Sequence, residues 1–199
     1  MTDSPVFRLA DRVVDESAAA SPIFATYGGI PGYDDKLTDF SPQANDERAA
    51  QERGWLADLA ALPAADRDDR LAAAVMEERI GSQLQGYDAG EHLRDVNVLF
   101  SPVQITRNVF TLMPAATDEH WETIATRLEA VPEALGTAQA AYLEGVARDL
   151  RPAVRQVLGA ARSAAITAGH ESEGDAAPAP FFPGFVAGYA GDDAALRAR

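Results

Sequence analysis

Prolines divide this 199-residue chain into segments in which apolar side chains recur every three or four positions. This spacing places the apolar side chains on one face of an α-helix, whereas a half-buried strand would alternate them with polar ones. Proline is tolerated in the first turn of a helix, so the Ser-Pro pairs at 41–42 and 101–102 are expected helix starts. The pattern predicts an all-α fold, a bundle-like array of about seven helices with no substantial sheet.

The same spacing indicates which face of each helix is buried. In the long helix expected from Pro132 onwards, the residues expected to face the core are Leu135, Ala138, Tyr142, Val146 and Leu150. The large aromatic side chain of Trp55 is expected to anchor the core, and so is that of Trp121. The buried face of the helix expected between residues 66 and 85 comprises Leu71, Val75, Met76, Ile80 and Leu84.

The domain organisation follows from a change in composition near residue 170. We expect residues 1–170 to form one helical domain. Residues 171–180 are polar, small and proline-rich and read as a linker. Residues 181–199 read as the start of a further helical segment, and we expect that segment to be truncated. Its aromatic residues are expected to form a docking face, made of Phe181, Phe182, Phe185 and Tyr189.

Charge and composition narrow the classes of function. With 31 acidic and 17 basic side chains the formal net charge is −14, which disfavours nucleic acid and anionic membrane surfaces as partners. Cysteine is absent, which excludes disulfides, thiolate metal sites and a cysteine nucleophile. We see neither a signal peptide nor an apolar run long enough to span a bilayer, so the cytoplasm is the expected location.

The sequence contains no recognisable catalytic or metal-binding motif. A helical H-E-x-x-H motif would place two histidines one turn apart on one face, where they bind zinc. The segment that begins His170-Glu171 fails this pattern because position 174 is glycine. We therefore expect no catalytic residue and no metal ligand, and we interpret His92, His120 and His170 as structural or surface residues.

Two small polar groups remain as candidates for a binding role. Tyr33, Asp34 and Asp35 lie in a turn-rich loop, where aspartate either bonds nearby backbone N–H groups or contacts a substrate or cation. Arg107 and Asn108 are polar residues inside an otherwise apolar helix, so they lie either on its exposed face or at an interdomain or pocket contact. Both alternatives stay open for each group.

Two stretches of the chain carry a family resemblance. The loop G-I-P-G-Y-D-D-K-L-T-D-F-S-P from Gly29 to Pro42, with the helix carrying W-L-A-D-L-A-A-L after it, resembles the N-terminal region of the bacterial domain of unknown function 885 (DUF885) family. The stretch R-L-E-A-V-P-E-A-L-G-T-A-Q-A-A-Y-L from Arg127 to Leu143 is similar to the middle helices of that family. The likeness covers most of the chain, in order.

The resemblance implies a mostly helical, zinc-metallopeptidase-like hydrolase whose H-E-x-x-H-type motif and glutamate ligand lie in the C-terminal half of a longer chain. No residue here matches those ligands, so no catalytic role is carried over and zinc is expected only in the missing half. We therefore expect an N-terminal helical scaffold that walls the substrate cleft. Its expected partners are the C-terminal catalytic half, in the same or a separate chain, and a peptide substrate of the assembled protein.

Two alternatives to the scaffold interpretation remain at this stage. The chain is either a stand-alone helical protein-interaction module without catalytic activity or a truncated product without an independent role. A separately encoded C-terminal half would favour the scaffold, whereas a stable, soluble monomer without such a half would favour the module.

Overall fold

The computed structural model describes residues 4–172, 174 and 177–198, which contain helices but no β-strand. This confirms the predicted all-α fold. The helices are α1 (Pro5–Ala20), α2 (Pro22–Tyr27), α3 (Pro42–Ala61), α4 (Arg67–Asp88), the 3-10 helix η1 (Glu91–Leu93), α5 (Pro102–Asn108), the 3-10 helix η2 (Val109–Leu112), α6 (Asp118–Glu129), α7 (Val131–Ala147), α8 (Val154–Thr167), α9 (Phe181–Val186) and α10 (Ala194–Ala198).

The structure has more helices than the sequence predicts, because three of them are too short to be recognised from the spacing of their apolar residues. Helices α2, α9 and α10 have six, six and five residues, too few to show a helical period. Helices α3 and α5 begin at the two expected Ser-Pro pairs. Side-chain oxygens of Ser41, Asp66 and Thr117 each accept a hydrogen bond from the backbone N–H three residues on, at 3.2, 2.9 and 3.3 Å.

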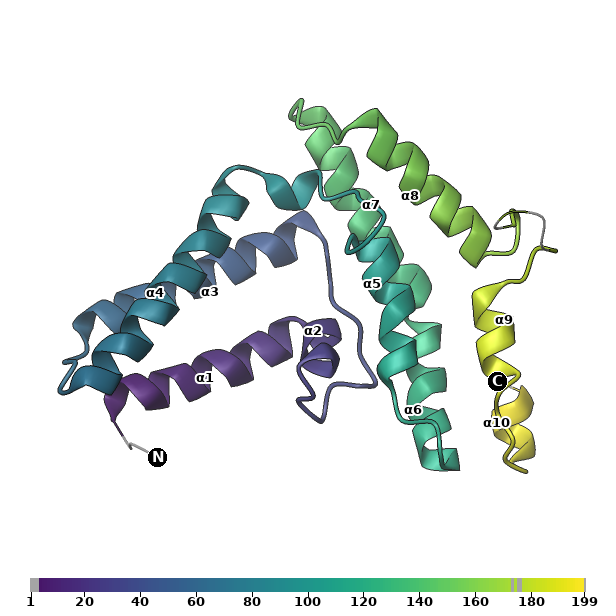
Figure 1. Ribbon diagram of the computed structural model, residues 1–199, viewed down its shortest axis with the longest axis horizontal. Helices are drawn as coiled ribbons and strands as arrows, with labels where there is room; N and C mark the ends of the chain where they lie inside the picture. The colour runs from purple at the N-terminus through teal and green to yellow at the C-terminus, as the bar shows by residue number, and fades with distance from the viewer. Residues whose placement is uncertain (1–3, 173, 175–176, 199) are drawn as a thin grey trace.

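The helices form two groups with separate cores (Figure 1). Helices α1, α3 and α4 pack together, with Leu9, Leu59 and Trp55 among their buried side chains. Helix α2 follows α1 directly but buries Ile23 in the other core, against α5, η2 and α6. The second core comprises Ile23, Ile105, Val109, Phe110, Met113, Trp121 and Ile124. Both tryptophans are therefore core anchors, as expected.

Helix α7 packs through small side chains, so the expected buried face is confirmed at Ala138 and wrong at Val146. Val146 is exposed, and Leu135 and Tyr142 are only partly buried. The reason is close approach, because a Cβ atom at Gly145 would lie 2.2 Å from the carbonyl oxygen of Leu93 in η1. The buried residues of α7 are Ala134, Ala138, Ala141 and Gly145.

Helix α4 also departs from its expected buried face. Leu71 and Val75 are 62% and 51% exposed, so their assignment to the core is wrong. Met76, Ile80 and Leu84 do pack against the other helices of their group. The helix is rotated so that the small side chains at 72 and 73, rather than those at 71 and 75, face α1 and α3.

Helix α8 is the least buried of the long helices. Among its 14 residues only Ala160 is buried, and Val154, Val157 and Leu158 are exposed. Helices α9 and α10, which follow it in the sequence, lie beside α6 (Figure 1). The division into 1–170, 171–180 and 181–199 stays a prediction, and residues 1–3, 173, 175–176 and 199 of those ranges lie outside the described residues.

No helix in the described part of the chain combines the length and the apolar character that a membrane crossing requires.

Candidate functional site

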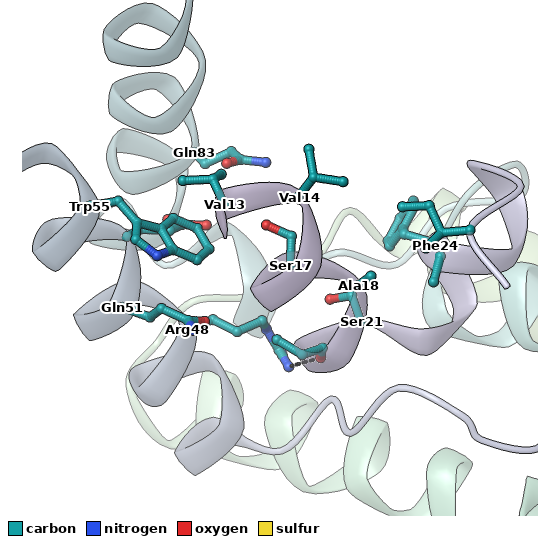
Figure 2. A pocket seen from close by; sticks show the side chains of 14 residues that line it. Val13, Val14, Ser17, Ala18, Ser21, Phe24, Arg48, Gln51, Trp55 and Gln83 are labelled. Atoms are coloured by element: carbon teal, nitrogen blue, oxygen red, sulfur yellow. Dashed lines mark hydrogen bonds between the residues drawn. The ribbon is translucent and has the colours of Figure 1, made fainter. Parts of the chain in front are cut away.

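A groove of about 330 Å³ runs between α1, α2 and α3 (Figure 2). Val13 and Val14 of α1 line it, with Trp55 of α3 and Phe24 of α2 at opposite ends of the view. The charged residues of its lining are Arg48 and Glu52, which lie one helical turn apart on α3. Its size lies at the lower end of the range for small-ligand pockets.

Arg48 fixes one side of the groove. Its Nη1 donates hydrogen bonds to the carbonyl oxygens of Asp39 at 2.9 Å and Ala20 at 3.4 Å, and its Nη2 donates to Oδ1 of Asn45 at 3.0 Å. Ala20 is the last residue of α1, so the guanidinium lies at the carbonyl end of that helix, where a cation is favoured. Burial lowers the pKa of Arg48, and the nearby carboxylate of Asp39 opposes this shift.

Glu52 also lines the groove, on the same helix as Arg48. Within the described residues its carboxylate forms no hydrogen bond and no ion pair within 4.0 Å, so Arg48 and Glu52 are not joined. Burial raises the pKa of Glu52, while the charges of Arg48 and Arg53 lower it. The groove thus holds one partly desolvated cation and one partly desolvated anion that do not neutralise each other directly.

The loop from residue 28 to residue 41 borders this groove and is fastened by a second arginine. The side chain of Arg127 on α6 is fully buried, and its Nε donates to the carbonyl oxygen of Lys36 at 2.8 Å. Its Nη2 donates to the carbonyl oxygen of Pro22 at 3.2 Å and to Oγ1 of Thr26 at 2.9 Å. Its Nη1 lies 3.7 Å from Oδ1 of Asp34 and has no hydrogen-bond partner among the described residues. Burial lowers the pKa of Arg127.

Threonine hydroxyls attach the loop at two further points. The backbone N–H of Ile23 donates to Oγ1 of Thr38 at 3.2 Å, which holds the loop on α2. The backbone N–H of Phe40 donates to Oγ1 of Thr137 at 3.0 Å, which holds it on α7. Together with Arg48 and Arg127 these bonds connect the loop to both helix groups.

The three loop residues singled out in the sequence are placed differently from one another. Asp34 accepts a hydrogen bond from Oγ1 of Thr26 at 2.6 Å and faces Arg127. The Nζ of Lys36 lies 5.9 Å from the ring centroid of Tyr33. Asp35 is exposed at the surface. Contact of these residues with a substrate or another domain stays a prediction.

Two further sets of predicted site residues contact each other: the polar pair on α5, and the aromatic residues of the predicted docking face. The guanidinium of Arg107 lies 4.4 Å from the ring centroid of Phe181, and its Nη1 donates to Oδ1 of Asn108 at 3.0 Å. Phe182 packs edge-on to Phe110 with ring centroids 5.7 Å apart. The rings of Phe185 and Tyr189 lie 5.6 and 5.5 Å from Trp121. The four aromatic residues of the predicted docking face are therefore half-buried against α5, η2 and α6, and docking of a partner there stays a prediction.

The histidines are dispersed over the structure. His92 stacks on Tyr87 with ring centroids 4.7 Å apart, and Nδ1 of His120 accepts a hydrogen bond from the backbone N–H of Ala116 at 3.2 Å. His170 is exposed. The described residues contain no group of three metal-ligating side chains, so no candidate metal centre is assigned.

The sequence interpretation missed Arg48, Glu52 and Arg127. A signal existed for Arg127, since it follows Ile124 by three positions and so lies on the apolar face of α6. An arginine in such a position needs buried acceptors. For Arg48 and Glu52 the sequence holds no comparable signal, because both look like ordinary charges on a polar helix.

Comparison with known proteins identifies the family. No match was found among curated proteins. The family model described as "Bacterial protein of unknown function (DUF885)" matches residues 22–199, which is most of the chain and includes the fastened loop and both arginines. The chain therefore belongs to the DUF885 family.

Proposed function

We propose that this chain is the helical scaffold of a zinc-metallopeptidase-like hydrolase and packs against the metal-binding half of such a protein. The metal-binding half would supply zinc and the activated water, and this chain would wall the substrate cleft. The cytoplasmic location and the peptide substrate of the assembled enzyme are parts of this proposal.

The observation that carries the proposal is the exposed apolar face of α8. Val154 and Leu158 are 73% and 66% exposed, although α8 buries only Ala160. A helix of 14 residues is marginally stable alone in water and depends on packing of its apolar face. Leu143 and Val146, on the preceding helix α7, are exposed as well. Apolar side chains left uncovered on two consecutive helices favour a further folded partner.

The membership of the chain in the DUF885 family supports the choice of that partner. The resemblance implies that the metal-binding residues of this family lie in a C-terminal half that follows a helical region such as this one. A catalytic half that follows α10 in the same or a separate chain is a partner whose surface would be matched to these helices. Family membership and the uncovered apolar helices together favour the scaffold over a stand-alone interaction module.

The test is reconstitution with the C-terminal half of a DUF885 protein from the same organism. We expect a one-to-one complex by gel filtration, with zinc and peptidase activity in the complex and neither in this chain alone. Tightly bound zinc or peptidase activity in the isolated chain would overturn the scaffold role. Cell fractionation checks the location.

Two matched variants locate the interface. Leu158→Asp on α8 is expected to abolish the complex, because it buries a carboxylate in an apolar contact. Leu71→Asp on α4 introduces the same charge at a leucine of similar exposure, 62% against 66%, and is expected to leave the complex intact. Equal effects of the two variants on the complex would exclude α8 from the interface with the C-terminal half. If the chain is a stable monomer that binds another protein but does not bind the C-terminal half, the interaction module is favoured instead.

A further inference from the structure

The groove of Figure 2 contains two opposite charges that the fold brings close but does not pair. Arg48 and Glu52 are separated by one turn of α3, a spacing at which side chains commonly form ion pairs. They form none here within 4.0 Å, and both are partly removed from water. Such a pair of half-desolvated charges is favourable for a ligand that carries both complementary charges.

Both groups keep hydrogen-bonding capacity for a ligand. A guanidinium has five N–H donors, and the printed contacts of Arg48 use Nη1 twice and Nη2 once. Its Nε and one Nη2 hydrogen have no partner within the described part of the chain. The carboxylate of Glu52 accepts no hydrogen bond from the described residues. The site therefore offers donors at one point and acceptors at another.

The walls between these points are apolar. Val13, Val14 and Trp55 line the α1–α3 side, and Phe24 and Ile30 line the side toward the loop. Val14 and Phe24 remain about half exposed, at 50% and 57%, so they present apolar surface that the fold itself does not cover. A ligand with an apolar body would remove this surface from water.

We propose that this groove binds a small apolar zwitterion, namely a free amino acid with a branched or aromatic side chain or a short peptide of such residues. Its ammonium group would be held by Glu52, its carboxylate by Arg48, and its apolar body by Val13, Phe24 and Trp55. The site belongs to this chain alone, so the proposal does not rest on the docking of a catalytic half and fails or succeeds independently of it.

The experiment titrates the full 199-residue chain by calorimetry and by tryptophan fluorescence, since Trp55 lines the groove. The probes are leucine, the dipeptide leucyl-leucine, and the same dipeptide with its amino end acetylated or its carboxyl end amidated. We expect saturable one-to-one binding of a free-ended probe and a loss of about tenfold or more on blocking either end, the usual effect of removing a charged hydrogen bond. Tighter binding of leucine identifies a free amino acid as the ligand, and tighter binding of leucyl-leucine identifies a short peptide.

Two charge variants on one helix test the assignment of Glu52. Glu52→Gln keeps the shape of the side chain and is expected to weaken a free-ended probe about tenfold, with little effect on the acetylated dipeptide. Glu47→Gln removes the same charge from α3 outside the groove lining and is expected to change neither. Trp55→Phe should remove the fluorescence change while calorimetric binding persists.

The proposal is overturned by any of three results. These are no binding of either free-ended probe, equal binding of free and blocked dipeptides, or equal effects of Glu52→Gln and Glu47→Gln.

Discussion

The loop from residue 28 to residue 41 and helix α8 are opposites in how they are held. The loop has no regular secondary structure, yet Arg48, Arg127, Thr38 and Thr137 fix its backbone through side-chain hydrogen bonds. Helix α8 satisfies its backbone internally but buries only Ala160. Regular secondary structure and tertiary anchoring are therefore separate properties in this chain, and the irregular segment is the better anchored of the two.

The loop and helix α8 are stabilised by different interactions. The loop depends on a few long-range hydrogen bonds to buried groups, so the loss of one partner leaves others unsatisfied. Helix α8 buries only Ala160, so most of its side chains can change without the loss of a buried contact. We expect single substitutions to be costly at the loop contacts and nearly silent on α8 in the isolated chain.

The largest effect is expected from Arg127→Met. Methionine fills similar space but removes the guanidinium that donates to the carbonyl oxygens of Pro22 and Lys36 and to the hydroxyl of Thr26, and it removes the ion pair with Asp34. Breaking such a buried charged contact on one side costs about 3–5 kcal/mol, measured as the free energy of unfolding in urea. Arg148→Met removes an exposed ion pair with Glu144 and should cost less than about 1 kcal/mol. If the two variants lose equal stability, the loop is not fastened through Arg127.

A smaller, pH-dependent effect is expected at the join between the two helix groups. His92 in η1 stacks on Tyr87, its Nδ1 is buried without a hydrogen-bond partner in the described part of the chain, and burial lowers its pKa below the ordinary 6.5. As pH falls through 6.5 the unfolded chain takes up a proton at this residue at a higher pH than the folded chain does, so stability is lost toward acid. At pH above 6.5 both states are neutral at His92 and the contribution vanishes.

The variant His92→Phe keeps the stacking and removes this titration. The stability of wild type relative to His92→Phe should fall between pH 7.5 and pH 5.5, by at most about 1.4 kcal/mol per pH unit for a single proton. Urea unfolding at several pH values measures the difference. A difference that is independent of pH would show that His92 titrates alike in the folded and unfolded chains.

The smallest effect is expected from Leu158→Asp in the isolated chain. Its side chain is already in water, so the free energy of unfolding should change by about 0.5 kcal/mol or less. Leu93→Ala, at a position that is 1% exposed, should cost about 2–5 kcal/mol under the same conditions. A large loss for Leu158→Asp would mean that α8 is covered in the isolated chain, for example by self-association.

Local chemistry made much of the fold predictable from sequence. The caps at Ser41, Asp66 and Thr117 involve atoms within three residues, so the sequence alone predicts them. The rotation of each helix was less predictable. Alanine is apolar but small, and the sequence does not show that α7 approaches η1 closely enough to exclude larger side chains.

The candidate site was less accessible to such reasoning than the fold. The partners of Arg127 lie 91 to 105 residues away in the sequence, and no local pattern links an arginine to distant carbonyl groups. Arg48 and Glu52 gain their significance only when α1 and α2 close the groove over them. Asp34 was singled out for its loop position, and its contact with Arg127 emerges only from the tertiary structure.

The sequence distance between Arg127 and the loop has a consequence for the newly made chain. A ribosome adding about 5–20 residues per second completes Arg127 roughly 5–20 s after Lys36. During that interval α1, α3 and α4 can already associate, because the contacts among these three helices lie within the first 88 residues. The loop is therefore made before Arg127, at a time when α1, α3 and α4 can already be packed together. The hydrogen bonds from Arg127 to the loop form late in biogenesis, and they join the second half of the protein to the first.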